Sequence, residues 1–155
     1  MPNRTRIDLM FRLASLGCIL FLGAVSCAPA APIDVGGSWS GTITWTSGPR
    51  ASLNSAFAMD IFDDQGDLTG RAEFSSGYMN TFEIPITSGA VHADTIVFEA
   101  SGQNPFTTPP TPVRFAFDGS VNGTTMSGVG TQFVNDTSCT FAWRATLVAP
   151  PAPES

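Results

Sequence analysis

The side chains that most often perform catalysis or hold metal ions are scarce in this sequence. His92 is the single histidine, and no second histidine or pair of cysteines lies at a spacing that would complete a transition-metal site with it. At the start of a predicted strand, such a histidine is typical of a solvated side chain. The sequence also lacks the Gly-x-Ser-x-Gly nucleophile motif and a glycine-rich phosphate loop. We therefore expect no enzyme activity, no catalytic residue and no cofactor.

Carboxylates are more numerous, and three of them gather in the segment Asp63-Asp64-Gln65-Gly66-Asp67. The cluster could attract Ca²⁺ by charge, but it lacks the residue order and the distal glutamate of an EF-hand loop. Gly66 can instead supply the positive φ of a tight hairpin. The segment is therefore predicted to be a turn, and no metal site is expected. The other acids fall mostly at outward or turn positions, where solubility is the simplest explanation.

Residues 1–26 are typical of an export signal. Three arginines precede an apolar run, residues 13–25, and small residues follow, which is the layout of a secretory signal peptide. The run is too short, and too closely followed by Pro29 and Pro32, to predict a lasting transmembrane helix.

The end of this run, Leu22-Gly23-Ala24-Val25-Ser26-Cys27, resembles the lipobox of bacterial lipoproteins. In that family the cysteine thiol is acylated and the cysteine becomes the new N-terminus. The resemblance implies lipidation at Cys27 and a membrane partner reached through the lipid in the bacterial cell envelope. The Ala- and Pro-rich residues that follow predict a short, stiff tether over residues 27–33. Ser15-Leu16-Gly17-Cys18 is a second possible box, which would leave a shorter apolar run interrupted by Arg12.

The alternative is a secreted or periplasmic soluble protein that is cleaved after Ala28 or Ala30. If Cys27 is retained without lipid, it could pair with Cys139 in an oxidising compartment. If Cys27 carries lipid, Cys139 is left alone and is expected to pack as a small buried hydrophobe.

Length and charge limit the remaining possibilities. The 155 residues support one domain, which we place at residues 34–148, with a Pro-rich, disordered tail at residues 149–155. The chain has no lysine and a net charge of −6, and removal of the leader would leave four arginines and 12 acids, a net charge of −8. Such a balance repels phosphate backbones, so no nucleic-acid partner is expected.

The predicted folded part begins with a segment in which apolar and polar residues alternate strictly. Trp39, Ile43 and Trp45 share one face of residues 36–46, and serines and threonines occupy the other, which predicts a half-buried strand. The expected strands cover roughly residues 36–46, 53–62, 68–75, 81–87, 91–100, 113–118, 124–133 and 139–147. Hairpin signals at Gly66, Ser88-Gly89 and Asn122-Gly123 join several of them. Residues 101–112, with four prolines, are predicted to be the long irregular loop of the domain.

Eight short strands without an intervening helix pattern favour an all-β fold, an eight-stranded antiparallel up-and-down β-barrel. A two-sheet β-sandwich is the alternative. An outer-membrane barrel is disfavoured, because charged residues occupy the face opposite the bulky apolar set. That bulky set is expected to point inward, and Leu53 with it; the set comprises Trp39, Trp45, Phe57, Phe74, Phe82, Phe98, Phe115, Phe117, Phe141 and Trp143. Inward Gly41, Gly70, Gly128 and Gly130 would leave room among them.

Two segments carry a further resemblance. Gly37-Ser38-Trp39 looks like the Gly-x-Trp that opens the first strand of calycins, the superfamily of lipocalins, fatty-acid-binding proteins and avidins, and residues 143–148 are similar to the last strand of avidin-type barrels. The resemblance implies a barrel that holds a small apolar or heterocyclic ligand, with Trp39 packed near Arg144.

Two functions therefore remain open. In the first, the barrel binds a small apolar ligand at its mouth, with an aromatic lining formed by Trp39, Trp45, Phe106 and Trp143. In the second, the interior is solid, and the protein is an envelope module that contacts another protein as an inhibitor or structural component. Phe106, among the prolines of the long loop, is expected to be either a lid over one barrel mouth or a contact displayed for a partner.

Overall fold

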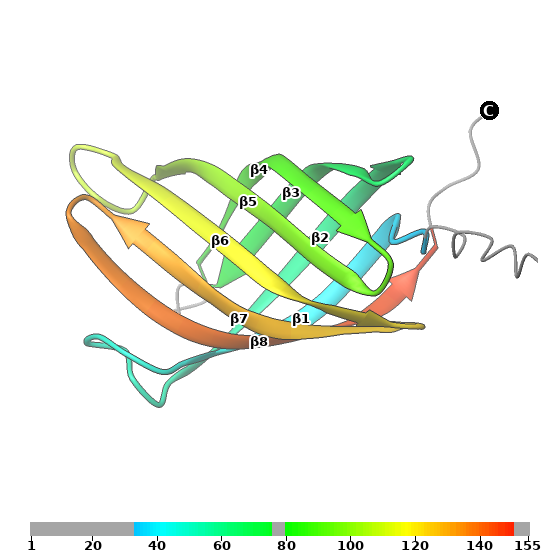
Figure 1. The fold of residues 1–155 in the computed structure, drawn as a ribbon. Coiled ribbons are helices and arrows are strands. Elements are labelled where there is room, and N and C mark those ends of the chain that lie inside the picture. The colour runs from blue at the N-terminus through cyan, green and yellow to red at the C-terminus, as the bar shows by residue number, and fades with distance from the viewer. Residues whose placement is uncertain (1–32, 76–79, 151–155) are drawn as a thin grey trace, which may run out of the picture.

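Eight strands form a closed antiparallel barrel in chain order, in which the last strand pairs with the first (Figure 1). The computed structural model describes residues 33–75 and 80–150, so the expected leader, Cys27 and the end of the tail lie outside the described residues. The strands are β1 Gly37–Trp45, β2 Asn54–Asp64, β3 Asp67–Ser75, β4 Thr81–His92, β5 Thr95–Asn104, β6 Thr111–Asn122, β7 Thr125–Val134 and β8 Thr137–Ala149. The prediction of an eight-stranded up-and-down barrel is confirmed.

The two rims of the barrel differ, as the right and left sides of Figure 1 show. One rim, called the turn end, carries the two-residue turns 65–66, 93–94 and 123–124. The start of β1 and the end of β8 also lie there. The opposite rim, called the loop end, carries residues 46–53 and 105–110 and the turn 135–136. Both of the longer connections that the structure describes in full therefore lie on one rim, and binding residues are most often found in such connections.

Two expected connections are wrong. Ser88-Gly89 is not a turn, because β4 continues through a bulge between Ile86 and Ser88, and the chain reverses at Ala93-Asp94. Gly89 serves packing instead: a Cβ there would lie 2.7 Å from the Cβ of Phe98. His92 accordingly ends β4 rather than beginning the fifth strand.

The long loop is also shorter than expected. Residues 101–104 extend β5 and pair with residues 111–114 of β6, so only residues 105–110 are irregular. The prediction failed because prolines mark where a ladder is interrupted but not how far the paired strands reach beside them. Pro112 lies within β6, opposite Gln103.

Alternation along each strand separates core from surface. The buried side chains of the described residues are all apolar. Of the ten bulky residues expected to point inward, nine are buried, and Phe82 is partly buried against the same core. Leu53 was also expected to point inward, and this expectation is wrong: it precedes β2 in the connection from β1 and is 57% exposed.

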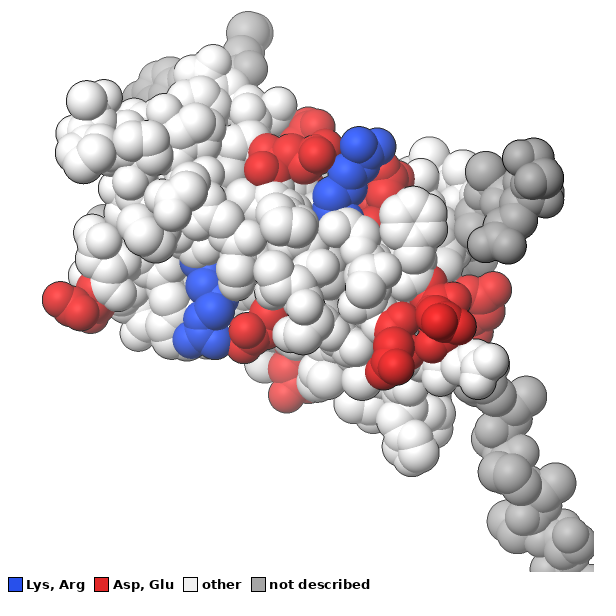
Figure 2. Space-filling model, turned by 90° about the horizontal axis from the view of Figure 1, so that it is seen from above, with Lys and Arg blue, Asp and Glu red and all other residues white. Residues whose placement is uncertain are grey.

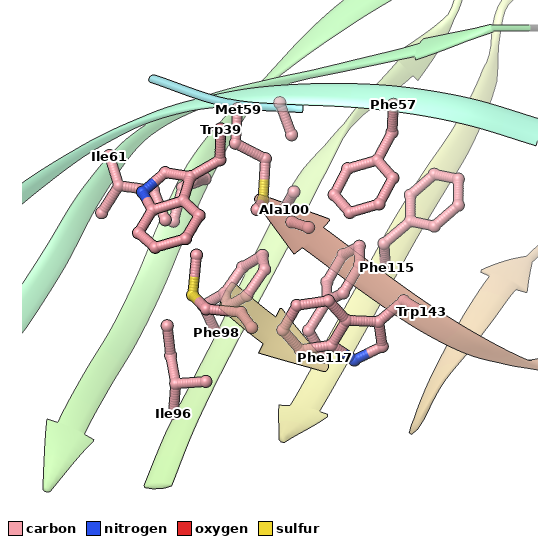
Figure 3. Packing of buried hydrophobic residues seen from close by; sticks show 14 of the residues in the cluster. Trp39, Phe57, Met59, Ile61, Ile96, Phe98, Ala100, Phe115, Phe117 and Trp143 are labelled. Carbon is pink, nitrogen blue, oxygen red and sulfur yellow. The ribbon is translucent and has the colours of Figure 1, made fainter. Parts of the chain in front are cut away.

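Aromatic rings fill the middle of the barrel (Figure 3). Phe117 stands at the centre of this packing: its ring centroid lies 4.3 Å from that of Phe98, 5.3 Å from that of Phe141 and 5.5 Å from that of Trp143. The Phe57 ring lies where a Cβ on Gly41 would stand, and the Phe141 ring does the same at Gly130. The space left by these glycines is therefore occupied by rings and is not free for a ligand.

Trp143 links β8 to β7, its neighbour, and to β6, the next strand beyond. Its indole N–H lies 3.1 Å from the carbonyl oxygen of Val129 and 3.3 Å from that of Asp118, on β7 and β6. Gly119, on β6, leaves the room for this approach, because a Cβ there would lie 2.7 Å from the indole ring. The buried polar atom of the indole is thus satisfied without a polar side chain in the core.

Removal of the central ring should be costly. Phe117→Ala is expected to lower the free energy of unfolding by about 3–5 kcal/mol, because it opens a cavity among rings that hold one another in place. Phe62→Ala is the matched control: Phe62 is 65% exposed, and its loss should change stability by no more than about 0.5 kcal/mol. Guanidinium unfolding followed by tryptophan fluorescence measures both variants. Equal losses would contradict the central role of Phe117.

Candidate functional site

The four aromatic residues expected to line one ligand site do not meet at one mouth. Trp39 lies near the turn end and Trp45 at the loop end of β1, so they are separated by about 20 Å of strand. Trp143 lies in the packed middle of the barrel, and Phe106 belongs to the connection at the loop end. Only Trp45 and Phe106 share a rim.

The turn end is closed by the residues that precede β1. Val35 is fully buried, and its carbonyl oxygen accepts a hydrogen bond of 2.9 Å from the indole N–H of Trp39. The backbone N–H of Val35 donates to Asp63 Oδ2 at 3.1 Å, which holds this segment across the rim. The tryptophan that the calycin resemblance singles out therefore helps to seal the barrel.

Arg144 does not pack near Trp39, contrary to that resemblance. In the register of β1 and β8, Trp39 pairs with Leu147, whereas Arg144 pairs with Thr42. Trp39 is buried inside the barrel, and Arg144 is exposed on its outer face. The two side chains point to opposite sides of the wall because their positions differ in parity along the paired strands.

The loop end is nearly filled. A hollow of about 30 Å³ remains among Trp45, Arg50, Phe82 and their neighbours, whereas sites for small ligands usually measure about 300–1,000 Å³. The guanidinium of Arg50 lies over the Trp45 ring, 5.5 Å from its centroid. The indole N–H of Trp45 donates to Ser55 Oγ at 3.3 Å. This rim has room for water but not for a ligand of ordinary size.

Phe106 both covers part of the barrel rim, as a lid would, and remains exposed, as a contact for a partner would be. Its ring meets Phe82 edge to face, with 6.2 Å between centroids, and thereby covers part of the rim. The residue nevertheless remains 48% exposed. Its backbone N–H donates to Asn104 Oδ1 at 3.0 Å, and the Thr107 hydroxyl donates to Thr111 Oγ1 at 2.8 Å, so the connection has internal support.

The second long connection at this rim, residues 46–53, is tied to β8. The backbone N–H of Thr140 donates to Ser47 Oγ at 2.8 Å, and the hydroxyls of Thr46 and Thr140 lie 2.8 Å apart. Beside these contacts, Cys139 is partly buried against the core and faces Gly48. Leu53, at the end of the connection, presents an apolar side chain to solvent.

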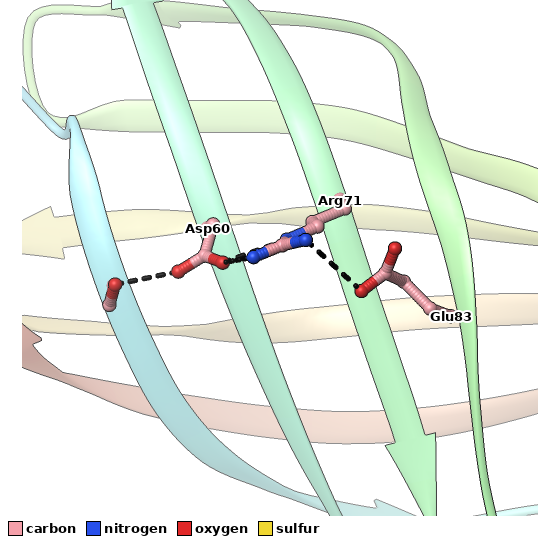
Figure 4. A network of polar contacts seen from close by, with 4 residues as sticks. Asp60, Arg71 and Glu83 are labelled. Atoms are coloured by element: carbon pink, nitrogen blue, oxygen red, sulfur yellow. Dashed lines mark hydrogen bonds and ion pairs between the residues drawn. The ribbon is translucent and has the colours of Figure 1, made fainter.

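A polar network crosses the outer wall from β1 to β4 (Figure 4). Asp60 accepts a hydrogen bond of 2.6 Å from the Ser38 hydroxyl and pairs with Arg71 at 2.8 Å, and Arg71 reaches Glu83 at 3.5 Å. The hydrogen bond from Ser38, followed by that from Arg71, lowers the pKa of Asp60. The alternation in the sequence places these residues at outward positions but does not reveal the network, because the contacts depend on the register between strands.

The acidic turn is structural. Asp63 Oδ1 accepts a hydrogen bond of 2.8 Å from the backbone N–H of Gly66, and its other carboxylate oxygen holds Val35. Within residues 33–75 and 80–150, no group of three His, Cys, Asp or Glu side chains is placed to hold a metal ion. His92 is exposed at the end of β4.

Charged side chains are sparse on the face seen in Figure 2, where acidic groups outnumber basic ones. Acids also gather at the turn end, at Asp34, Asp63, Asp64, Asp67 and Asp94. The described part of the chain contains no helix that is long and apolar enough to cross a bilayer.

Comparisons of the chain with protein-family models, with curated proteins and with solved structures give no match in any of the three. The function must therefore be inferred from the residues and geometry of this chain.

Replacement of the central acid of the polar network should weaken the barrel in a pH-dependent way. A carboxylate whose pKa is lowered by folding stabilises the protein at pH values above its pKa in the unfolded chain, about 3.9. This contribution is lost as the pH falls through the pKa in the folded protein. Asp60→Asn should thus be less stable than the parent at neutral pH, and the difference should shrink below about pH 4. Because Asp60 and Arg71 are 36% and 58% exposed, we expect a loss below about 1 kcal/mol.

Denaturant unfolding between neutral and acidic pH measures this difference. Asp118→Asn, which alters an exposed acid outside the network, is the control and should give a smaller loss at neutral pH. A gap between Asp60→Asn and the parent that stays constant through acidic pH would overturn the assignment.

Proposed function

We propose that the protein is an exported, lipid-anchored module of the bacterial cell envelope that acts through its outer surface and loop end, and not by carrying an apolar ligand inside. The observation that supports this proposal best is the filled interior. Rings centred on Phe117 occupy the middle of the barrel, Val35 closes the turn end, and about 30 Å³ remains at the loop end. A pocket of ordinary ligand size would require several of these side chains to move together.

The direction of the chain gives the proposed anchor a geometric consequence. The described chain enters β1 at the turn end, so a lipid on Cys27 would place this rim toward the bilayer. The loop end, with partly exposed Phe106 and exposed Leu53, would then face away from the membrane and toward other envelope components. Aromatic side chains such as that of Phe106 are enriched in the contact surfaces of protein–protein interfaces.

Chain length disfavours the alternative in which Cys27 pairs with Cys139. Val35 is held at the turn end by Asp63, and eight residues of extended chain from Cys27 span at most about 28 Å. Cys139 lies ten residues along β8 from Ala149 at the turn end, about 33 Å away. A pair within one chain would therefore need almost fully extended chain along nearly the whole of β8, which favours a separate fate for Cys27.

The calycin relationship is proposed at the level of architecture only. The up-and-down connectivity and the buried Trp39 on β1 are consistent with it, whereas the position of Arg144 is not. The ligand that the resemblance implies is disfavoured by the packed interior.

A fluorescent apolar probe tests the interior directly. Aminoanthracene added to the purified protein should show no saturable binding and no quenching of the buried indoles, because the rings leave no cavity of its size. Phe117→Ala, which opens a cavity in the core, is the positive control for a probe the size of benzene. Saturable binding of one aminoanthracene per barrel in the parent protein would overturn the solid-core proposal.

The anchor has its own test. The chain expressed from its full sequence in a bacterium should be recovered from membranes with the mass of a diacylglycerol and an acyl chain on the peptide that begins at Cys27. Cys27→Ser should remove this mass and release the protein into the soluble fraction, since the thiol is the acceptor. Cys18→Ser is the matched control and should leave the lipid in place. A lipid that persists in Cys27→Ser, or a parent chain without lipid, would contradict the anchor.

A further inference from the structure

The outer wall formed by β7, β8 and β1 is unusual in charge. The described residues include eleven carboxylates and four arginines, yet none of these three neighbouring strands carries a carboxylate. Figure 1 shows them side by side along the lower wall of the barrel. Arg144 is the single charged residue on this wall. A protein with an excess of acids therefore keeps one broad face free of them, around one cation.

Arg144 is also the one arginine of the described residues without a charged or aromatic partner. Arg71 and Arg114 form ion pairs with acids, and Arg50 lies over Trp45. Arg144 makes no such contact and is exposed. Its planar guanidinium, with several N–H donors, is suited to bind a carboxylate through two hydrogen bonds.

Hydroxyl groups surround this cation. Arg144 pairs in register with Thr42 of β1 and with Ser127 of β7, and the next outward position on β8, Thr146, pairs with Ser40. All four hydroxyl-bearing residues line the same surface hollow as Arg144, which measures about 560 Å³. Within the described part of the chain, none of these four hydroxyls takes part in a side-chain hydrogen bond, so each can donate to or accept from a bound molecule.

We propose that this hollow binds an acidic saccharide, with its carboxylate on Arg144 and its hydroxyls on Ser40, Thr42, Ser127 and Thr146. The hollow is an open depression of the outer wall, and a sugar acid matches its lining in both charge and hydrogen-bonding groups. A simple inorganic anion would use Arg144 but not the extended set of hydroxyls. The inference rests on the proposed function in one respect, namely that the protein acts through its outer surface.

The test uses the full chain, purified from membranes in mild detergent and labelled with ¹⁵N. Galacturonic acid disaccharide is the probe, the uncharged galactose disaccharide tests the need for the carboxylate, and sulfate tests the need for the sugar. The acidic disaccharide should shift the amide signals of Thr42, Ser127 and Arg144, and the neutral disaccharide should bind at least about tenfold more weakly, since it lacks the charge-assisted hydrogen bonds.

Arg144→Gln should weaken binding of the acidic disaccharide by about tenfold or more, with an unchanged circular dichroism spectrum because the side chain is exposed. Arg114→Gln, which removes an arginine paired with Glu99, is the matched control and should retain parental affinity. Shifts outside the hollow, or equal affinity in Arg144→Gln and the parent, would overturn the site. Sulfate that binds as tightly as the acidic disaccharide would overturn the saccharide assignment.

These outcomes are separate from the tests of the proposed function. Loss of the saccharide site would leave the mass of the Cys27 peptide and the exclusion of aminoanthracene unaffected. Conversely, an apolar probe bound inside the barrel would not alter the signals of an outer wall that faces solvent.

Discussion

Mutual packing of aromatic rings inside a closed sheet is the interaction on which the rest of this structure depends. An eight-stranded barrel encloses an interior just wide enough for side chains to fill. Here Phe57 and Phe141 enter the space beside glycines on neighbouring strands, and Phe117 packs against both rings. Large aromatic side chains are therefore matched by glycines on the strands beside them. Neither the closed rims nor the outer surface would hold its geometry without this solid centre.

The alternation of apolar and polar residues was sufficient to predict the strands, their number and the barrel, because one face of every strand must enter the same core. Glycine was the main source of error. Gly66 lies in a tight turn with φ of 100°, whereas Gly89 lies within β4, where it makes room for Phe98. Both follow polar residues in the sequence, and only the neighbour across the sheet distinguishes the two roles.

The candidate sites were less predictable than the fold, since they depend on which residues face one another across strands. The polarity pattern places Asp60 and Arg71 on the outer face but does not reveal that they pair in register and include Ser38. Similarly, the sequence shows Arg144 beside a tryptophan, while the structure surrounds it with hydroxyls from two other strands. A binding wall assembled from separate strands leaves no continuous motif.

The pairing of β8 with β1 has a consequence for how the barrel can be rearranged. Gly37 and Ala149 lie at the same rim, on strands that are hydrogen-bonded to each other. A peptide that joined Ala149 to the residues before β1, with Val35 kept in place, would close the backbone into a ring, and the two-residue connection 135–136 on the opposite rim would be the natural place for new termini. Without such a link, β8 and β1 are the one neighbouring pair of strands in the described barrel that no chain connection joins, so their closure depends on hydrogen bonds and packing alone.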